Sequence, residues 1–521
     1  MKRWDTCDSK VTRWLSFLAK QMVSDRMRDM RWLLLILVTS LLQLTQGVTV
    51  EMRHTHGVFY PDVKQQAVLQ LKITGEPGEK ITKLEFSDGK TSQTSDIQMA
   101  YLSTSGGWNG YTLNTNKLAQ EKGKAKPDKK GKFSFDVDIE IGGEPVYYWL
   151  SYNLGRGAKR GSLIDALCTR VTLADGSTVK PKLKRAAALK ERVAGRIYPF
   201  PYRVVPYYRP RWVKGWGNAK EAVHLTPEHF NLFTDLVHFA YTVSAEGDVQ
   251  YQWAGEGADP QVVSDEALAE IKRLHNEAKA KSLLLAGFAH MDEPMTQAVA
   301  NPETRRKLAR NMATWAIERG YNGIDIDWEY PDTHDQWVNF GLFIADLREE
   351  IAGSGLSLSI AASVTYKVPI CDVTDQLDFL MTMSYDDLGD QHASMGRFQG
   401  DAHKCLNDFH MPRQRVVIGL PFYSNQKGTL STQYGYSQII SWYPRIKPTE
   451  NEFQSKNQDG SPGPMHSFNG PQLIAEKCRW MKQEKFGGVM IWAYDTDVKL
   501  NHRASLAKAM YKVVRQSKGK K

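Results

Sequence analysis

The sequence predicts a (β/α)₈ barrel at residues 200–515, preceded by an all-β sandwich at residues 48–180. In the N-terminal region, apolar and polar residues alternate with a period of two, and no long helical pattern intrudes. After about residue 200, short apolar runs alternate with helical patterns, an arrangement typical of a (β/α)₈ barrel. A doubly wound open sheet is the alternative, although no GxGxxG or phosphate-binding loop follows any of the runs.

Residues 1–47 have the features of a secretion leader. The apolar run Trp32–Leu44 follows three arginines and ends shortly before the small residue Gly47. It is shorter than a membrane span, which needs about 20 residues, and it suits the apolar region of a signal peptide. We therefore expect a secreted, extracellular protein without stable membrane anchoring. An uncleaved signal anchor is the alternative.

Two stretches of the N-terminal region predict strands with one buried face. Phe133–Ile141 alternates strictly, Val146–Tyr152 is a second strand candidate, and Asp88-Gly89 and Asp175-Gly176 predict hairpin turns. The region also contains a dense aromatic set: Tyr101, Trp108, Tyr111, Tyr147, Tyr148 and Trp149. This set favours a carbohydrate-binding surface, with a plain structural sandwich as the alternative.

Residues 181–199 are basic and rich in alanine, which predicts a linker, and residues 516–521 form a basic tail. Because the barrel has its own core, we expect it to fold without the sandwich. The predicted barrel strands are 203–208, 235–240, 282–287, 323–328, 356–362, 377–384, 416–422 and 488–493. The predicted helices are 265–281, 302–320, 336–353, 471–486 and 502–514.

Charge and cysteine content exclude several classes of protein. The net charge of +10 is spread over the leader, a lysine-rich stretch at 117–132 and the C-terminal tail, so we expect no nucleic-acid partner. The five cysteines are widely spaced and match neither a zinc site nor a redox pair, so we expect no metal and no cofactor. Cys371 and Cys405 are candidates for a disulfide in a secreted protein, and buried free thiols are the alternative.

The most informative stretch is NGIDIDWEYP, residues 322–331. Asp325, Asp327 and Glu329 are spaced by two, so on a strand their carboxyl groups point the same way. The intervening residues, Ile324, Ile326 and Trp328, would face the surrounding helices. Carboxylates held close together raise one another's pKa, which can make one of them a general acid near neutral pH. Glu329 lies nearest the C-terminal end of the strand, where barrel active sites open. An exposed edge strand with one charged face is the alternative.

Four segments carry a family resemblance. NGIDIDWEYP resembles the D-G-x-D-x-D-W-E motif of family 18 glycoside hydrolases, the chitinase family. LMTMSYD (380–386), GLPFY (419–423) and GGVMIW (487–492) are similar to the segments of that family on strands six, seven and eight. The motifs occur in the family's order over about residues 200–515, which makes the combination specific, although GLPFY or GGVMIW alone would indicate a buried strand.

The resemblance implies a retaining enzyme in which the N-acetyl oxygen of the substrate is the nucleophile. Glu329 would be the general acid and then the base, and Asp327 would bind the acetamido N–H. Asp325 would control the protonation of Asp327, and Tyr385 would hydrogen-bond the acetamido oxygen. Trp492 would form the floor under the sugar at subsite −1. The other substrate-binding candidates are Met383, Asp386, Tyr207, Phe239, Trp328 and Tyr423.

Three features depart from the family pattern. The first acid of the motif is Asn322 here, for which we expect weaker tuning of the site and not a loss of activity. The S-x-G-G segment of strand three is replaced by Leu285–His290, which would change the bottom of the site. Residues 423–468 are too few for the small α+β domain that walls the cleft in many members, so we expect an open, shallow groove.

Taken together, these features predict a secreted, monomeric chitinase that acts on chitin or N-acetylglucosamine oligosaccharides. A chitin-binding lectin with a silent barrel is one alternative, although silent members typically lose the acid that Glu329 supplies here. An endo-β-N-acetylglucosaminidase acting on N-glycans is the other. The aromatic content of 11% favours a linear chitin chain.

We predict that the leader is removed on secretion. N-terminal sequencing of protein collected from the medium should start near Val48, because the small residue Gly47 precedes it. A mature chain that retains residues 32–44 and partitions into membranes would establish the signal anchor instead.

Overall fold

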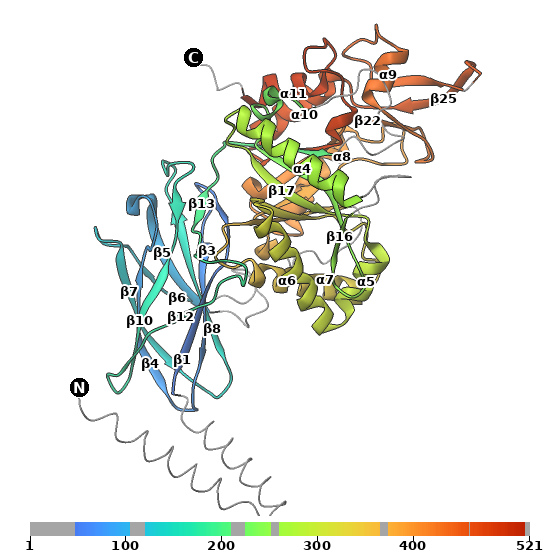
Figure 1. Ribbon diagram of the computed structural model, residues 1–521. Coiled ribbons are helices and arrows are strands. Elements are labelled where there is room, and N and C mark those ends of the chain that lie inside the picture. Colours follow the sequence, from blue (N-terminus) through green and yellow to red (C-terminus); the bar gives the residue numbers. More distant parts are fainter. Residues whose placement is uncertain are drawn as a thin grey trace, which may run out of the picture.

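The computed structural model describes residues 47–104, 120–209, 225–251, 260–364, 374–457 and 459–515. A β-sandwich and an α/β barrel make up this part of the chain (Figure 1). The predicted leader up to residue 46, the basic tail and the residues Trp108, Tyr111 and Cys371 lie outside the described residues.

The sandwich consists of two sheets that share one apolar core. Its strands are β1 (Thr49–His54), β3 (Gln66–Thr74), β4 (Lys80–Ser87), β5 (Ile97–Thr104), β6 (Gln120–Ala125), β7 (Lys132–Glu140), β8 (Val146–Leu154), β10 (Leu167–Leu173), β11 (Thr178–Val179) and β12 (Lys182–Leu183). The sheet orders are β12-β1-β3-β8-β5-β6 and β11-β10-β4-β7. Alternate residues of β7 and β8, such as Phe135 and Leu150, enter the common core, which confirms the predicted period of two.

One of the two predicted hairpins forms. Asp175-Gly176 connects the antiparallel strands β10 and β11, and Gly176 has a positive φ of 83°. The hairpin predicted at Asp88-Gly89 is wrong, because β4 and β5 belong to different sheets. Asp88 instead anchors a crossover: its backbone N–H donates to the carbonyl of Gly131 at 2.9 Å, and its carboxylate accepts the Thr94 hydroxyl.

The described aromatic residues of the sandwich do not form an exposed platform. Trp149 and Tyr148 are buried, and Tyr101 and Tyr147 are half-buried. Trp149 points away from the core, and its cross-strand neighbour Gln70 is also buried. Because an adsorbing sugar needs an open ring face, these four rings do not support the predicted carbohydrate-binding surface.

The predicted linker at 181–199 is part of the folded structure. β12 pairs in parallel with β1, and β13 (Gly195–Ile197) pairs with β2 (Val58–Phe59) and β9 (Leu163–Ile164). Ala186, Ala194 and Tyr198 are buried. The segment therefore fixes the sandwich to the start of the barrel.

Eight parallel strands close the barrel, and each overlaps one predicted apolar run. They are β14 (Arg203–Tyr208), β15 (Asp235–Val243), β17 (Leu283–Phe288), β18 (Gly323–Ile326), β19 (Ser357–Ala362), β20 (Phe379–Thr382), β21 (Val416–Pro421) and β26 (Gly488–Trp492). The order is β14-β26-β21-β20-β19-β18-β17-β15, and β14 also pairs with β15, which closes the ring. A short strand, β16 (Val249–Tyr251), is added antiparallel to β15. The (β/α)₈ prediction is confirmed.

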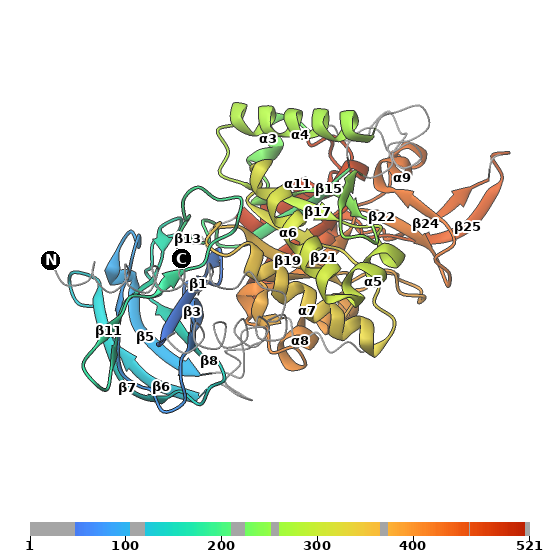
Figure 2. The ribbon, with the colours of Figure 1, turned by 60° about the horizontal axis from the view of Figure 1, so that its bottom comes forward.

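Helices surround the strands (Figure 2). The predicted helices are present as α4 (Pro260–Glu277), α6 (Pro302–Glu318), α7 (His334–Glu350), α10 (Pro471–Gln483) and α11 (Leu506–Arg515). The helices α3 (Pro227–Phe230), α5 (Asp292–Ala300), α8 (Met395–Asn407) and α9 (Tyr436–Trp442) were not predicted. In α3, α5 and α9, few helical turns leave little periodicity to detect.

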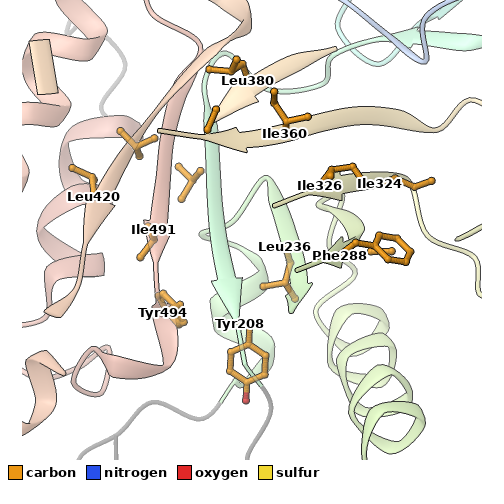
Figure 3. Packing of buried hydrophobic residues seen from close by; sticks show 14 of the residues in the cluster. Tyr208, Leu236, Phe288, Ile324, Ile326, Ile360, Leu380, Leu420, Ile491 and Tyr494 are labelled. Carbon is orange, nitrogen blue, oxygen red and sulfur yellow. The ribbon is translucent and has the colours of Figure 1, made fainter. Parts of the chain in front are cut away.

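Successive residues along a barrel strand point alternately into an outer core and an inner core. Figure 3 shows part of the outer core, where Ile324 and Ile326 of β18 lie near Phe288 and Ile360. The smaller inner core contains residues such as Leu285. Since each strand is buried on both faces, an inward polar residue needs a partner inside the barrel.

A small α+β insertion follows β21, so the expectation that this segment is too short for one is wrong. β22 (Tyr423–Gln426), β23 (Gln433–Gly435), β24 (Glu452–Lys456) and β25 (Pro462–Ser467) form an antiparallel sheet. The sheet and α9 extend to one side of the barrel in both ribbon views. Very short strands let a segment of this length form a complete sheet.

Buried charged groups bind the sandwich to the N-terminal end of the barrel. Asp378, just before β20, accepts the backbone N–H of Val58 at 3.1 Å and the guanidinium of Arg348 at 2.9 Å. Burial alone would raise the pKa of Asp378, but Arg348 and a hydrogen bond from His56 outweigh burial and hold it far below the ordinary carboxyl value.

A second buried cluster lies at the start of β14. Arg203 donates to the carboxylate of Asp235 and, at 2.9 Å, to the hydroxyl of Tyr60. Tyr198 donates to the same carboxylate. Tyr60 belongs to the sandwich side, so removing the sandwich would strip partners from buried charges of the barrel. The expectation that the barrel folds alone therefore lacks support from this interface.

The cysteines of the described residues are buried. Cys168, Cys405 and Cys478 are free thiols, so the predicted Cys371–Cys405 disulfide is not formed. Cys405 packs in the outer core on α8, which provides an apolar environment for a thiol. Among the described helices, none has the length and apolar character needed to cross a membrane.

We predict that Asp378→Asn destabilises the whole chain. The variant keeps the shape of the side chain but leaves Arg348 with an uncompensated buried charge, which costs about 3–5 kcal/mol. The free energy of unfolding in urea at neutral pH measures the loss. Because the folded pKa is depressed, the wild-type contribution is present at neutral pH and disappears as the pH falls below the ordinary carboxyl range.

Asp138→Asn is the matched control for this experiment. Asp138 is exposed on β7, so its replacement should change the unfolding free energy by less than about 0.5 kcal/mol. Equal stability of the two variants would show that the junction does not hold the domains together.

Candidate active site

Three carboxyl groups lead from the barrel interior to its mouth. Asp325 lies on β18, and Asp327 and Glu329 lie in the loop that follows. Asp325 is fully buried, Asp327 is 4% exposed, and Glu329 is exposed. The exposure of the three acids therefore increases along the chain, from the dry interior of the barrel to the solvent.

Asp325 is held by two hydroxyl groups inside the barrel. Ser359 of β19 donates to its Oδ1 at 2.6 Å, and the Tyr207 hydroxyl of β14 donates to its Oδ2. Burial raises the pKa of Asp325 to about 6, although both hydrogen bonds oppose the shift. A carboxyl group with this pKa can exchange a proton with a neighbouring acid near neutral pH.

Asp327 is the least satisfied of the three acids. Its Oδ1 is buried and has no hydrogen-bond partner among the described residues. Burial raises its pKa well above the ordinary value, and the charges of Glu329 and Asp325 add to the shift. Its backbone N–H donates to the carbonyl of Phe288 at 2.9 Å, which ties the loop to β17. The side chain thus offers a buried oxygen to a polar ligand.

Glu329 stands at the mouth of the barrel. Partial loss of hydration raises its pKa, and the carboxylates of Asp386 and Asp292 add to the effect. Asp292, at the start of α5, also accepts the backbone N–H of Glu329. Glu329 therefore combines a raised pKa with access to water, which a group that delivers and then removes a proton requires.

Tyr385 and Met383 follow β20 and belong to the inner core. Burial raises the pKa of the Tyr385 hydroxyl well above the ordinary value, and the nearby charges of Asp327 and Asp386 add to the shift. The hydroxyl therefore stays protonated and can donate a hydrogen bond. Met383 lies near Tyr330, with 3.9 Å between its Sδ and the Tyr330 hydroxyl oxygen.

The insertion fixes the direction of Asp386. The Tyr423 hydroxyl and the Asn425 Nδ2, both on β22, donate to its Oδ1 at 2.5 Å each. The Nδ1 of His392 lies 3.5 Å from the same oxygen and 3.3 Å from the Asn425 Nδ2. Asp386 has a positive φ of 64°, a conformation that aspartate tolerates better than most residues.

An aromatic cluster lies at the C-terminal ends of β26, β14 and β15. The ring centroids of Trp492 and Phe239 are 4.8 Å apart, and that of Tyr207 is 5.6 Å from each. Arg209 lies 5.5 Å from the Trp492 ring and is bonded through two nitrogens to Asp495. These contacts hold the half-buried indole in one orientation, as stacking against a sugar requires.

Trp328 lies away from this cluster. Its ring packs against Phe340 of α7 at a centroid distance of 5.4 Å, within the outer core. Ile324, Ile326 and Trp328 all point outwards, as the period of two predicts. Trp328 therefore does not lie with the other aromatic substrate-binding candidates, which belong to or pack against the inner core.

Two departures from the family pattern have local explanations. Asn322 precedes β18, and its Oδ1 accepts the backbone N–H of Leu284 at 3.0 Å. A neutral amide makes this bond as a carboxylate would, at the end of the strand remote from Glu329. In the segment 285–290, His290 has a positive φ of 53°, and its ring centroid lies 5.4 Å from that of Phe239. The segment therefore adds an imidazole beside the aromatic cluster.

The contributors to the site that were not predicted include Ser359, Asn425, His392, Arg209 and Asp292. Ser359 could have been found, because a serine facing into a closed barrel needs a polar partner. Asp292 begins a helix, and the others lie in loops or the insertion, where no periodicity indicates direction. Within the described ranges, no group of three or more His, Cys, Asp or Glu side chains could hold a metal ion.

The arrangement suits the cleavage of a glycosidic bond. Glu329 provides an acid that water can reach, and Asp327 and Tyr385 provide a buried acceptor and a buried donor beside it. Trp492 adds an aromatic floor for a pyranose ring. Acids with environments that separate their pKa values, at the C-terminal end of a (β/α)₈ barrel, define the class of glycoside hydrolases.

Comparison with known proteins agrees with this class. The family model "Glycosyl hydrolases family 18" matches residues 203–497. "Probable chitinase 2" of Drosophila melanogaster is 24% identical over 371 residues, which cover 60% of this chain and 76% of that protein. "Probable endochitinase" of Caenorhabditis elegans is 23% identical over 390 residues, which cover 62% of this chain and 61% of that protein. A chitinase from Bacteroides thetaiotaomicron has a similar fold, with a TM-score of 0.50, 20% identity, and coverage of 61% of this chain and 98% of that one.

Since the family match spans more than half of the sequence, the chain belongs to glycosyl hydrolase family 18. It is a glycoside hydrolase, and the family resemblance of its four motifs is confirmed.

We predict that Ser359→Ala moves the acidic limb of the pH–activity profile to higher pH. The Ser359 hydrogen bond lowers the pKa of Asp325, so its loss keeps Asp325 protonated to a higher pH. One such bond is worth about 1 kcal/mol, or about 0.7 pH unit. The pH dependence of kcat/KM on a chromogenic oligosaccharide measures the shift.

Ser357→Ala provides the control, because Ser357 lies two residues away on β19 and contacts Asn322 rather than Asp325. Its acidic limb should match that of the wild type. The same profile for all three proteins would mean that Asp325 does not control the acidic limb.

Proposed function

We propose that the protein is a secreted chitinase that hydrolyses β-1,4 linkages between N-acetylglucosamine units, with Glu329 as general acid and base. The observation that carries the proposal is the row from Asp325 to Glu329, in which the inner acids are buried and the outer acid meets solvent. The chitinase names of the relatives from Drosophila melanogaster and Caenorhabditis elegans support the substrate.

In the first proposed step, the acetamido oxygen of the sugar at subsite −1 attacks the anomeric carbon. The bond from that carbon to the leaving oxygen breaks, and Glu329 gives its proton to the leaving oxygen. Tyr385 orients the acetamido oxygen, and the free Oδ1 of Asp327 accepts the acetamido N–H. The positive oxazolinium ion that forms is stabilised by an ionised Asp327, whose proton Asp325 can take up at its pKa of about 6.

In the second proposed step, a water molecule attacks the anomeric carbon from the side that the leaving sugar vacated. Glu329, now a carboxylate, takes the proton from that water, and the oxazolinium ring opens. Two inversions at one carbon retain its configuration. The exposure of Glu329 suits this exchange of leaving group for water.

We further propose that the enzyme acts outside the cell as a monomer. The leader at residues 1–47 is the basis for the first point. For the second, the exposed large apolar residues of the described chain are few and scattered. They are Val193, Val338, Leu388, Leu430 and Met465.

We predict that Glu329→Gln lowers kcat by about 10²–10⁴-fold, because glutamine keeps the shape but cannot deliver a proton. Binding of chitin oligosaccharides, measured by calorimetry, should persist because stacking on Trp492 does not need the acid. Glu293→Gln is the control: Glu293 is an exposed residue of α5, and its loss should leave kcat unchanged. Retained turnover in Glu329→Gln would remove the assignment.

The choice of substrate tests the nucleophile and separates the alternatives. Cleavage should occur only after an acetylated sugar, and a thiazoline analogue of the oxazolinium ion should inhibit. Efficient hydrolysis of fully deacetylated chains would require a protein nucleophile and contradict the role of Asp327. Products from a high-mannose glycopeptide, and none from chitin oligosaccharides, would indicate an endo-β-N-acetylglucosaminidase. Binding without cleavage would indicate a lectin.

A further inference from the structure

A second pocket lies at the end of the barrel opposite the acids. It is a partly open hollow of about 880 Å³ between the segment before β14, the start of β14, and the helices α10 and α11. Val204, the second residue of β14, and Thr234, just before β15, lie on its wall. Glu329 follows the C-terminal end of β18, so the pocket is separate from the candidate active site.

The interior of this pocket is apolar. Phe200, Tyr202, Val204, Leu232 and Val514 line it. Val204, Leu232 and Val514 belong to the outer core, so the floor of the pocket is the surface of that core itself. A volume of this size is within the range of small-molecule sites, which hold about 300–1,000 Å³.

The rim of the pocket is cationic. Arg479 and Lys482 of α10, Lys485 just after α10, and Arg515 at the end of α11 all line it, and none of its lining residues is an acid. Lys482 donates to the carbonyl of Val513 at 2.7 Å, which holds its ammonium group at the wall. Arg515 donates to the carbonyl of Asn231.

No residue that lines the pocket supplies a negative charge. Residues 516–521, which follow Arg515 directly, contain three lysines and no acid. The substrate proposed for the active site is a neutral, hydroxyl-rich chain, which does not match an apolar wall under four cations. A ligand that matches has an apolar body and an anionic head.

We propose that this pocket binds a long-chain fatty carboxylate. The alkyl chain lies against the partly exposed apolar wall formed by Phe200, Tyr202 and Val513. The carboxylate lies at the rim, between Arg479 and Lys485. A single chain suits a pocket of this volume, and a carboxylate can accept hydrogen bonds from the cationic side chains of the rim.

Calorimetry with laurate tests this site on the full chain. We expect about one laurate molecule per chain, roughly 100-fold weaker binding of octanoate because four methylenes are lost, and at least about tenfold weaker binding of dodecyltrimethylammonium because its head is cationic. Equal binding of the cationic and anionic amphiphiles would overturn the proposal.

A charge-reversed variant tests whether laurate binds at this pocket. Arg479 and Lys485 are exposed, so the double variant Arg479→Glu/Lys485→Glu should fold and bind laurate about tenfold more weakly. Lys129→Glu/Lys512→Glu is the matched control, because it changes the net charge equally at exposed residues that do not line the pocket. Unchanged laurate affinity in the first variant, or equal losses in both, would show diffuse binding and refute the site. Chitin oligosaccharide turnover should be the same in all three proteins, so this result is independent of the proposed chitinase activity.

Discussion

The closed ring of parallel strands is the constraint on which the site depends. Once β14 pairs with both β26 and β15, half of the strand side chains point into a space closed to solvent. An acid placed there must be protonated or hydrogen-bonded. Asp325 is bonded by Ser359 of the neighbouring strand β19 and by Tyr207 of β14, which is not adjacent to β18 in the ring. The register of the barrel thus controls the protonation of the first acid.

The other two acids differ from Asp325 in how much of their charge the protein compensates. Asp327 has a buried oxygen without a partner and lies near two other carboxylates, and burial with these charges raises its pKa well above the ordinary value. Glu329 is exposed, so water competes with the same raising effects. A ligand N–H that reaches Asp327 would supply the missing bond and favour its charged form. Asp327 therefore keeps a hydrogen-bond acceptor in place before the substrate binds, at the position where a positive charge is expected to develop. Such a site is preorganised.

The sequence predicted the parts of the fold that repeat and missed those that depend on single contacts. The eight strands were detectable because a buried parallel strand is a continuous apolar run, and the carboxyl row because its period matches a strand. The length of the segment after β21 does not reveal the α+β insertion, because strands as short as β23 need few residues. Asn425 and His392 were missed because they reach Asp386 only through the folding of β22 and of the segment after β20, which periodicity does not indicate. The turn at Asp88-Gly89 was mistaken for a hairpin because a turn signal does not specify the sheet to which the next strand belongs.

Asp378 and Asp327 lie at opposite ends of the barrel, and their carboxylates differ in hydrogen bonding. At the N-terminal end, Asp378 and Arg203 are bonded across the junction with the sandwich. At the other end, Asp327 keeps an oxygen without a partner, and an unsatisfied buried group costs about 1–3 kcal/mol. A cost of this kind persists only where the surrounding structure is determined by other contacts. The bonds that the sandwich makes beneath the barrel are among the contacts that stabilise the fold in which Asp327 remains unsatisfied.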